Sequence, residues 1–274
     1  MEDRLVALLK CFELHARVFQ AGPFCHASEF YDDTELGYIH VVKQGQVRVE
    51  SPHHPALLID EPSVFFYLNP TRHRLIPSGS TVETVCASLE FGAGLSNPLA
   101  RALPDVMVIR LRDMPGLELS LQLLFQEAAE HHCGRQAMLD RLMEVVFIQV
   151  LRDAMDQQRV QVGLLAGLAD PRLVKAINAM HETPARAWSL EDLSAISGMS
   201  RARFAARFHD VVGMTPGHYL SEWRLAIAQS LLRQGKPVQW ISDTVGYGSA
   251  SALSRAFRSH VGLSPTEWLR KHSA

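Results

Sequence analysis

The chain has 274 residues, of which 47% are hydrophobic and 20% are charged, and its formal net charge is −2. This length is enough for two domains of ordinary size. No run of 18 apolar residues is present, and the charged residues Glu2, Asp3 and Arg4 exclude a signal-peptide layout. We therefore expect a soluble cytoplasmic protein with no membrane partner.

The small net charge hides an asymmetry between two parts of the chain. Residues 171–274 contain 13 Lys and Arg against 7 Asp and Glu, a net charge of +6, which leaves −8 for residues 1–170. A basic carboxy-terminal part suits a polyanionic partner, and an acidic remainder does not.

The four cysteines are scattered and lack the C-x-x-C spacing of zinc and redox motifs. They are Cys11, Cys25, Cys86 and Cys133. Neither a zinc site nor a disulfide framework is indicated, so we expect reduced thiols. Oxidation of Cys25 or Cys86 stays open, because it requires an exposed thiolate of low pKa that a sequence does not reveal.

The first 91 residues predict a short helix followed by many strands. Apolar residues in the first 15 positions have helical spacing, and the segments after them are rich in Val, Ile, Phe and Tyr and separated by turn residues. The predicted strands are 16–20, 38–42, 46–50, 56–60, 64–68 and 81–91. Short strands at this spacing favour an antiparallel sandwich or barrel.

The predicted strand 81–91 alternates between an apolar face and a face that carries Thr84, Cys86 and Ser88. We expect this polar face to line the barrel interior, where a few polar groups in apolar walls typically hold a small ligand. The candidate effector-binding residues are Tyr38, His40, His73 and Cys86. A buried structural thiol and a core histidine would explain the same pattern.

Residues 116–158 change to helical periodicity and predict two amphipathic helices that are broken near residues 132–134. Residues 162–171 follow as a predicted linker. Its last two residues, Asp170 and Pro171, have the types that cap and begin a helix. The chain thus divides into 1–115, 116–170 and 171–274.

The last third of the chain contains one pattern twice. Ser200, Phe204, Phe208, Gly213, Thr215 and Pro216 recur 49 positions later as Ser249, Leu253, Phe257, Gly262, Ser264 and Pro265. In each copy a serine can cap a helix, two apolar residues one turn apart form a buried face, and a glycine can end the helix. A short predicted helix that ends in glycine precedes each copy. Two helix-turn-helix units joined by an apolar helix, residues 216–232, are therefore predicted.

Residues 170–270 resemble the DNA-binding domain of the AraC/XylS family of bacterial transcription regulators. The matching strings are Gly198-Met199-Ser200-Arg201, Phe204 to Phe208, Gly213-Met214-Thr215-Pro216, Val245-Gly246-Tyr247, Ser254-Arg255-Ala256-Phe257-Arg258 and Gly262-Leu263-Ser264-Pro265. The resemblance implies double-stranded DNA as partner. It also implies a homodimer formed through the helices in residues 116–158, although these helices could simply pack on their own barrel.

The candidate DNA contacts lie on the recognition helices and at their starts: Ser200, Arg201, Arg203, Arg207, Ser249, Ser251, Ser254, Arg255 and Arg258. Arg201, Ser251, Ser254 and Arg255 are predicted on the faces opposite the buried residues, Arg203 and Arg207 are the further basic residues of the first unit, and Arg258 is expected to bind phosphate. Arginine can bond guanine with two hydrogen bonds, so Arg255 is the best candidate for base reading. The two units differ, since Ala206 and His209 occupy the positions that correspond to Arg255 and Arg258.

Residues 38–73 resemble the cupin-like effector domain at the amino terminus of one AraC subgroup. Tyr38 to Gly45, Glu61-Pro62 and Asn69 to His73 carry this likeness. Enzymatic cupins have a His-x-His pair, a glutamate and a later histidine, whereas only His40 and His73 stand near those places here. We therefore expect no metal, no other cofactor and no catalytic residue.

These features together predict a sequence-specific transcription regulator controlled by a small molecule or an oxidant sensed in the amino-terminal part. Activation and repression are not distinguished, and RNA polymerase stays open as a partner. One alternative is a cupin-type metalloenzyme fused to a DNA-binding module. Another is a constitutive DNA binder in which the barrel is purely structural.

Overall fold

The structure is a computed structural model that describes residues 3–12, 14–30, 36–68, 71–79, 81–91, 98 and 103–272. These residues divide into two compact units. The sheet unit consists of the described residues in 14–91 and 103–157, and the helical unit consists of residues 3–12, 98 and 158–272. None of the described helices combines the length and apolarity needed to cross a membrane.

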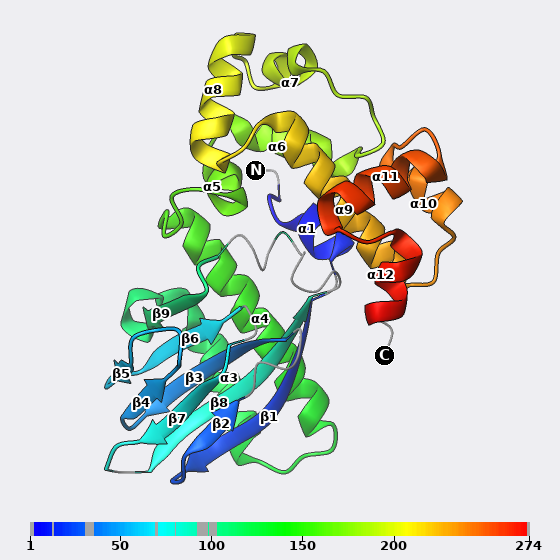
Figure 1. Cartoon of the computed structure of the whole chain (residues 1–274). Helices are drawn as coiled ribbons and strands as arrows, with labels where there is room; N and C mark the ends of the chain where they lie inside the picture. The colour runs from blue at the N-terminus through cyan, green and yellow to red at the C-terminus, as the bar shows by residue number, and fades with distance from the viewer. Residues whose placement is uncertain are drawn as a thin grey trace. The chain divides into compact units, whose positions relative to one another are not determined.

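Two antiparallel sheets form the sheet unit (Figure 1). The first has the order β1 (Leu14–Phe24), β8 (Val82–Phe91), β3 (Gly37–Gln44), β6 (Ser63–Tyr67) and β9 (Val106–Arg110). The second has the order β2 (Ser28–Phe30), β7 (His73–Pro77), β4 (Val47–Glu50) and β5 (Leu57–Ile59). Inward-facing residues of both sheets share one core. The described strands thus form a cupin-like sandwich whose two sheets have no strand in common, rather than a closed barrel.

Two helices, α3 (Glu118–Ala129) and α4 (Arg135–Asp156), pack on the first sheet. The Phe147 ring of α4 lies 5.8 Å from the Phe91 ring, between centroids. Helix α4 also provides hydrogen-bond partners for the backbone of the edge strand β1. The Val18 N–H donates to Asp140 at 2.7 Å, and Gln136 donates to the Val18 carbonyl at 2.7 Å. The two predicted helices are confirmed, and they cover their own sheet. Two 3-10 turns, η2 (Leu111–Asp113) and η3 (Pro115–Leu117), precede α3.

The helical unit contains nine described helices (Figure 1). They are α1 (Val6–Cys11), α5 (Leu164–Ala169), α6 (Leu173–Glu182), α7 (Leu190–Ile196), α8 (Arg201–Val212), α9 (Pro216–Arg233), α10 (Val238–Val245), α11 (Ala250–Val261) and α12 (Pro265–His272). Two features differ from the sequence expectation. The expected linker 162–171 contains helix α5, and residues 3–12, expected in the effector domain, belong to the helical unit.

Candidate DNA-binding surface and effector site

The first helix-turn-helix unit is formed by α7 and α8. Ser189 and Asp192 form a capping box at the start of α7, and the turn passes through Gly198 at a φ of 63°. The Ser200 hydroxyl then accepts a bond from the Arg203 backbone N–H at 3.4 Å and caps α8. Gly213 ends α8 in the left-handed region, at a φ of 83°. Both predicted ends of α8 are confirmed.

The second unit, α10 and α11, repeats this construction. Gly246 ends α10 at a φ of 86°, the Ser249 hydroxyl accepts from the Ala252 backbone N–H at 3.1 Å, and Gly262 ends α11 at a φ of 80°. The residue pairs Phe204/Phe208 and Leu253/Phe257 are fully buried, as their spacing predicts. Each recognition helix therefore presents its opposite face to solvent.

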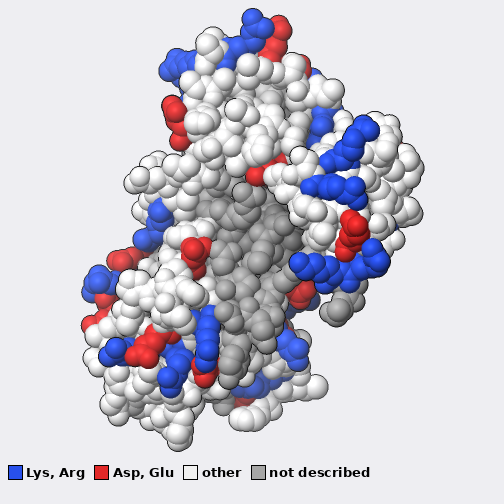
Figure 2. Space-filling model, in the orientation of Figure 1, with Lys and Arg blue, Asp and Glu red and all other residues white. Residues whose placement is uncertain are grey.

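Three of the predicted DNA-contacting arginines lie free on these faces. Arg201, Arg203 and Arg255 are exposed, and their guanidinium groups have no hydrogen bond or ion pair with another described residue. Ser251 is exposed as well, and Ser254 is half-buried. Arg258 is exposed but lies 3.5 Å from the Glu267 carboxylate. Figure 2 shows Lys and Arg side chains gathered over the α7–α8 end of the helical unit.

Arg207 forms an ion pair with Asp170 within the helical unit instead. Its Nε donates to Asp170 Oδ2 at 2.8 Å, and a second guanidinium nitrogen contacts the same oxygen at 2.5 Å. The Asp170 side chain is only 6% exposed and also accepts from the backbone N–H groups of Arg172 and Leu173. Burial alone would raise the pKa of Asp170, but these bonds and Arg207 outweigh it, so the pKa is lowered. Arg207 thus holds the start of α6 against α8.

The structure brings the four predicted effector residues together in the core of the sheet unit. Tyr38 and His40 lie on β3, His73 on β7 and Cys86 on β8, and all four are buried. Aromatic rings surround them: the His73 ring stacks on Tyr67 at 4.4 Å and on Phe30 at 4.7 Å, and the His40 ring stacks on Phe65 at 4.7 Å, between centroids. Sequence reasoning missed Phe30, Phe65 and Tyr67, although the alternation of β6 points Phe65 and Tyr67 to one face.

Burial sets the charge of the two buried histidines, and hydrogen bonds set which ring nitrogen carries the proton. Burial lowers the pKa of His73 to about 4 and holds the pKa of His40 well below its ordinary value, so both rings are neutral at pH 7. His73 Nδ1 lies 2.7 Å from the Thr71 carbonyl oxygen and must donate to it. His73 Nε2 therefore accepts from His40 Nε2–H, at 2.9 Å.

In this arrangement His40 Nδ1 is a hydrogen-bond acceptor to which no group of the described residues donates. The atom is buried and has no hydrogen-bond partner, and the same holds for the Tyr67 hydroxyl. Burial raises the pKa of Tyr67 to about 12, so its hydroxyl stays protonated and can donate. An unsatisfied buried polar group costs about 1–3 kcal/mol. A ligand that bonds these two atoms would recover that cost.

A surface pocket leads to the same histidine. Its volume is about 330 Å³, and it is lined by Glu29, Glu50, Ser51, Pro52, Arg72, His73 and Arg74. Arg72 donates to Glu29 Oε1 through Nε at 3.0 Å and through a terminal nitrogen at 2.6 Å. Within the described residues, no three His, Cys, Asp or Glu side chains are grouped so that they could hold a metal ion.

The two cysteines considered for redox sensing lie in different surroundings. Cys25 is exposed, and its sulfur lies 3.2 Å from His26 Nδ1. Cys86 is buried, and burial raises the pKa of its thiol to about 12, which disfavours the reactive thiolate. Cys86 pairs with Gln20 across the β1–β8 ladder, so Cys25 lies five residues further on, roughly 15 Å away. A disulfide between the two would require the strands to rearrange.

Two family models match the chain, one over the sheet unit together with residues 3–12 and the other within the helical unit. A family model described as Cupin matches residues 3–156, and a helix-turn-helix domain model matches residues 193–271. A cupin-like sheet unit joined to two helix-turn-helix units defines a two-domain transcription regulator. The chain belongs to the AraC-type family of transcription regulators.

Individual relatives carry the same description. A putative AraC-like transcription regulator of Streptomyces lividans is 34% identical over 199 residues, which are 71% of this chain and 65% of that protein. The RCS-specific transcriptional activator RclR of Escherichia coli is 30% identical over 236 residues, 84% of this chain and 82% of that protein. The chain thus matches only 65%, 59% and 51% of the length of three curated relatives. Fatty-acid-bound ToxT of Vibrio cholerae is 16% identical with a TM-score of 0.42, and the match covers 94% of each chain.

Proposed function

We propose that this protein binds duplex DNA at specific sequences by placing α8 and α11 in successive major grooves. The observation that carries the proposal is the pair of capped helices whose exposed faces present the unpaired arginines Arg201, Arg203 and Arg255. Recognition helices of helix-turn-helix proteins read base edges from the major groove, and successive grooves on one side of the duplex are about 34 Å apart. One chain can therefore read two adjacent half-sites.

The contacts divide into base-reading and phosphate-binding groups. We assign base reading to Arg255, helped by Ser251 and Ser254, in the second unit and to Arg201 and Arg203 in the first. Arg258, at the outer face of α11, binds phosphate. The hydroxyls of Ser200 and Ser249 accept the cap bonds but can still donate to a phosphate. Arg207 is a structural residue in this assignment, because Asp170 holds its guanidinium.

The sheet unit is the proposed sensor, and Tyr38, His40, His73 and Cys86 lie at its binding site. A ligand there would donate a hydrogen bond to His40 Nδ1 and accept one from the Tyr67 hydroxyl, the two unsatisfied atoms. It would be uncharged, since an unpaired charge in this aromatic core would be costly. The pocket beside His73 is the proposed entrance. An oxidant is the other proposed type of signal, with exposed Cys25 as the thiol that reacts first.

The sheet unit is also the proposed dimerisation unit. Helices α3 and α4 expose apolar side chains on the faces turned away from the sheet, and the exposed fractions are 74% for Leu119, 49% for Leu123, 46% for Met138 and 42% for Val145. A homodimer would cover this surface and pair two DNA-binding units. RNA polymerase would be a further partner if the protein acts as an activator.

Selection of genomic fragments by the purified chain tests the DNA-binding proposal. We expect enrichment of a motif with two half-sites about one helical turn apart, and loss of the enrichment in Arg255→Ala combined with Arg201→Ala. Repeating the selection with mild oxidant, and a thermal-shift panel of neutral metabolites, tests the two types of signal. Fragments enriched without any common motif would refute sequence-specific binding.

A further inference from the structure

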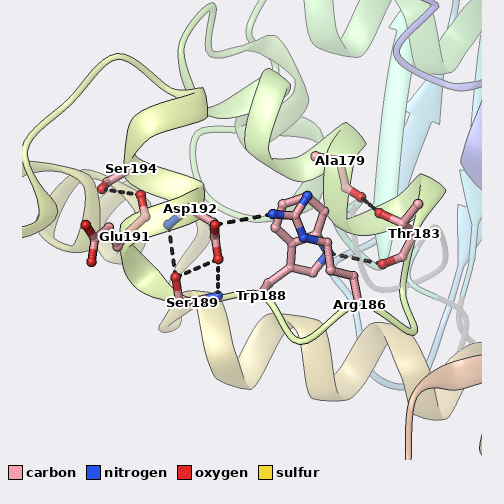
Figure 3. A network of polar contacts seen from close by, with 8 residues as sticks. All are labelled: Ala179, Thr183, Arg186, Trp188, Ser189, Glu191, Asp192 and Ser194. Atoms are coloured by element: carbon pink, nitrogen blue, oxygen red, sulfur yellow. Dashed lines mark hydrogen bonds and ion pairs between the residues drawn. The ribbon is translucent and has the colours of Figure 1, made fainter.

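The loop between α6 and α7, residues 183–188, is held by a network of polar contacts (Figure 3). At one end the Thr183 hydroxyl donates to the Ala179 carbonyl of α6 at 2.9 Å. At the other end the Arg186 guanidinium lies over the Trp188 ring, 4.0 Å from its centroid, and donates to Asp192 of the α7 capping box at 3.2 Å. Trp188 Nε1 closes the loop by donating to the Thr183 carbonyl at 3.1 Å. The start of the first helix-turn-helix unit is thus fixed to this loop.

The same loop is fixed to the connecting helix α9. Arg224 of α9 donates through Nε to the Pro184 carbonyl at 2.7 Å and through a terminal nitrogen to the Arg186 carbonyl at 2.9 Å. The two accepting carbonyls flank Ala185. A planar guanidinium can reach both carbonyls at once, whereas a lysine ammonium would hold only one in this geometry.

The loop also meets the turn of the second unit. A Cβ built on Gly246 would lie only 2.6 Å from the Cα and the carbonyl oxygen of Ala185, so the two backbones are in direct contact there. Gly246 also has a φ of +86°, which favours glycine. The neighbouring Tyr247 ring lies 5.9 Å from the Arg224 guanidinium carbon. Arg224 therefore sits where the first unit, the connecting helix and the second unit meet.

We propose that the 183–188 loop and Arg224 act as a brace that sets the separation and orientation of the two recognition helices, and thereby the half-site spacing that the protein accepts. Helix α9 alone joins the two units through the chain, and the brace is a second connection between them. One additional base pair moves a half-site by about 3.4 Å along the duplex and by about 35° around it. A braced pair of helices cannot follow such a displacement, and a pair joined by α9 alone can.

The inference rests on the proposed DNA binding, and its test separates the two. The full-length protein is titrated with a series of duplexes that carry the selected motif with its half-sites moved by up to 2 base pairs in either direction. We expect the wild type to prefer one spacing by about tenfold or more over its neighbours, and Arg224→Met to reduce this preference below about threefold while still binding. Arg224→Lys, which keeps the charge, should lie between the two.

Arg207→Met is the matched control, because it removes another arginine that bonds within the helical unit but not between the two helix-turn-helix units. It should leave the spacing preference unchanged. Gly246→Ala, which pushes the turn away from Ala185, should broaden the preference as Arg224→Met does. Arg224 variants that are folded by tryptophan fluorescence and keep the wild-type preference would overturn the brace. A wild type that binds none of the duplexes would instead overturn the proposed function.

Discussion

The Phe12 ring meets the Trp223 ring edge-on, with centroids 5.1 Å apart and an interplanar angle of 82°. Phe12 is fully buried, as is Leu8 one turn earlier, and the Ser230 hydroxyl of α9 donates to the Cys11 carbonyl at 3.3 Å. A segment from the amino terminus therefore completes the core of the carboxy-terminal unit. Residue 14 already begins β1 of the sheet unit. The helical unit thus needs residues from both ends of the chain.

Phe12→Ala should destabilise the helical unit by about 3–5 kcal/mol, the usual cost of removing a buried phenylalanine. The four tryptophans, Trp188, Trp223, Trp240 and Trp268, all lie in this unit, so tryptophan fluorescence during urea unfolding reports on it selectively. Phe19→Ala is the matched control, since Phe19 is 47% exposed on β1 of the sheet unit. An unchanged urea midpoint in Phe12→Ala would contradict the packing of α1 on α9.

Asp170→Asn should also destabilise the helical unit, by about 1–3 kcal/mol, because it removes the charge that Arg207 and two backbone N–H groups bind. The pKa of Asp170 is lowered in the folded state, so its contribution is present above the unfolded pKa, about 4, and is lost as the pH falls through the folded pKa. The difference between wild type and variant should therefore shrink in acid. Asp210→Asn, with a 79% exposed side chain, should show no such loss.

The repeat in the last third was readable because helix ends follow local rules. Ser200, Ser249, Gly213 and Gly262 act at the positions that their residue types predict, and local capping chemistry does not depend on the rest of the fold. Strand β7 was missed because its polar residues His73 and Arg74 break the apolar pattern of a strand, and only the pairing of His73 with Phe30 of β2 places it in a sheet. The three residues of β2 are too few to show a period.

Long-range contacts account for the rest of what the sequence did not show. Arg207 was predicted as a DNA contact because it is a basic residue of the recognition helix, and only the fold brings Asp170 to it, 37 positions away. The role of Arg224 depends on three segments that meet in space. The packing of α1 depends on Trp223, more than 200 positions away. Each of these contacts joins segments that are far apart in the sequence, so the residue pattern of a single segment does not predict it.

Buried His181 should make the stability of the helical unit depend on pH. Its ring stacks on Trp223 at 3.6 Å between centroids, and its Nε2 bonds the Tyr219 hydroxyl at 2.5 Å. Burial lowers the pKa of His181 to about 3, whereas an unfolded histidine has a pKa of about 6.5. Between these values the unfolded state alone binds the proton, so this residue should lower the free energy of unfolding by about 1.4 kcal/mol for each unit of falling pH.

His181→Phe should reduce that slope by one proton between about pH 6.5 and 4. The measurement is urea unfolding at several pH values, followed by tryptophan fluorescence. His209→Phe serves as the control, since His209 is exposed on α8. Equal slopes in wild type and His181→Phe would show that His181 is protonated in the folded protein.

Arg255 and Arg258 lie one turn apart on α11, and we expect their removal to have different effects on DNA binding. Arg255 has a free guanidinium on the proposed base-reading face, so Arg255→Ala should cost about 1–3 kcal/mol on the best site and relax the preference at one base pair. Arg258 lies further along the helix, beside Glu267. Arg258→Ala should weaken binding to all sequences alike and lower the slope of log affinity against log salt by about one.

The two variants are compared on a panel of single-base-pair changes in the selected site, at three salt concentrations. Because phosphate contacts carry the salt dependence and base contacts carry the sequence dependence, each variant should change one quantity and leave the other near its wild-type value. A uniform loss in Arg255→Ala, with no base pair relaxed, would reassign Arg255 to the phosphate backbone. Base reading by the second unit would then fall to Ser251 and Ser254, and the first unit, with Arg201 and Arg203, would carry most of the specificity.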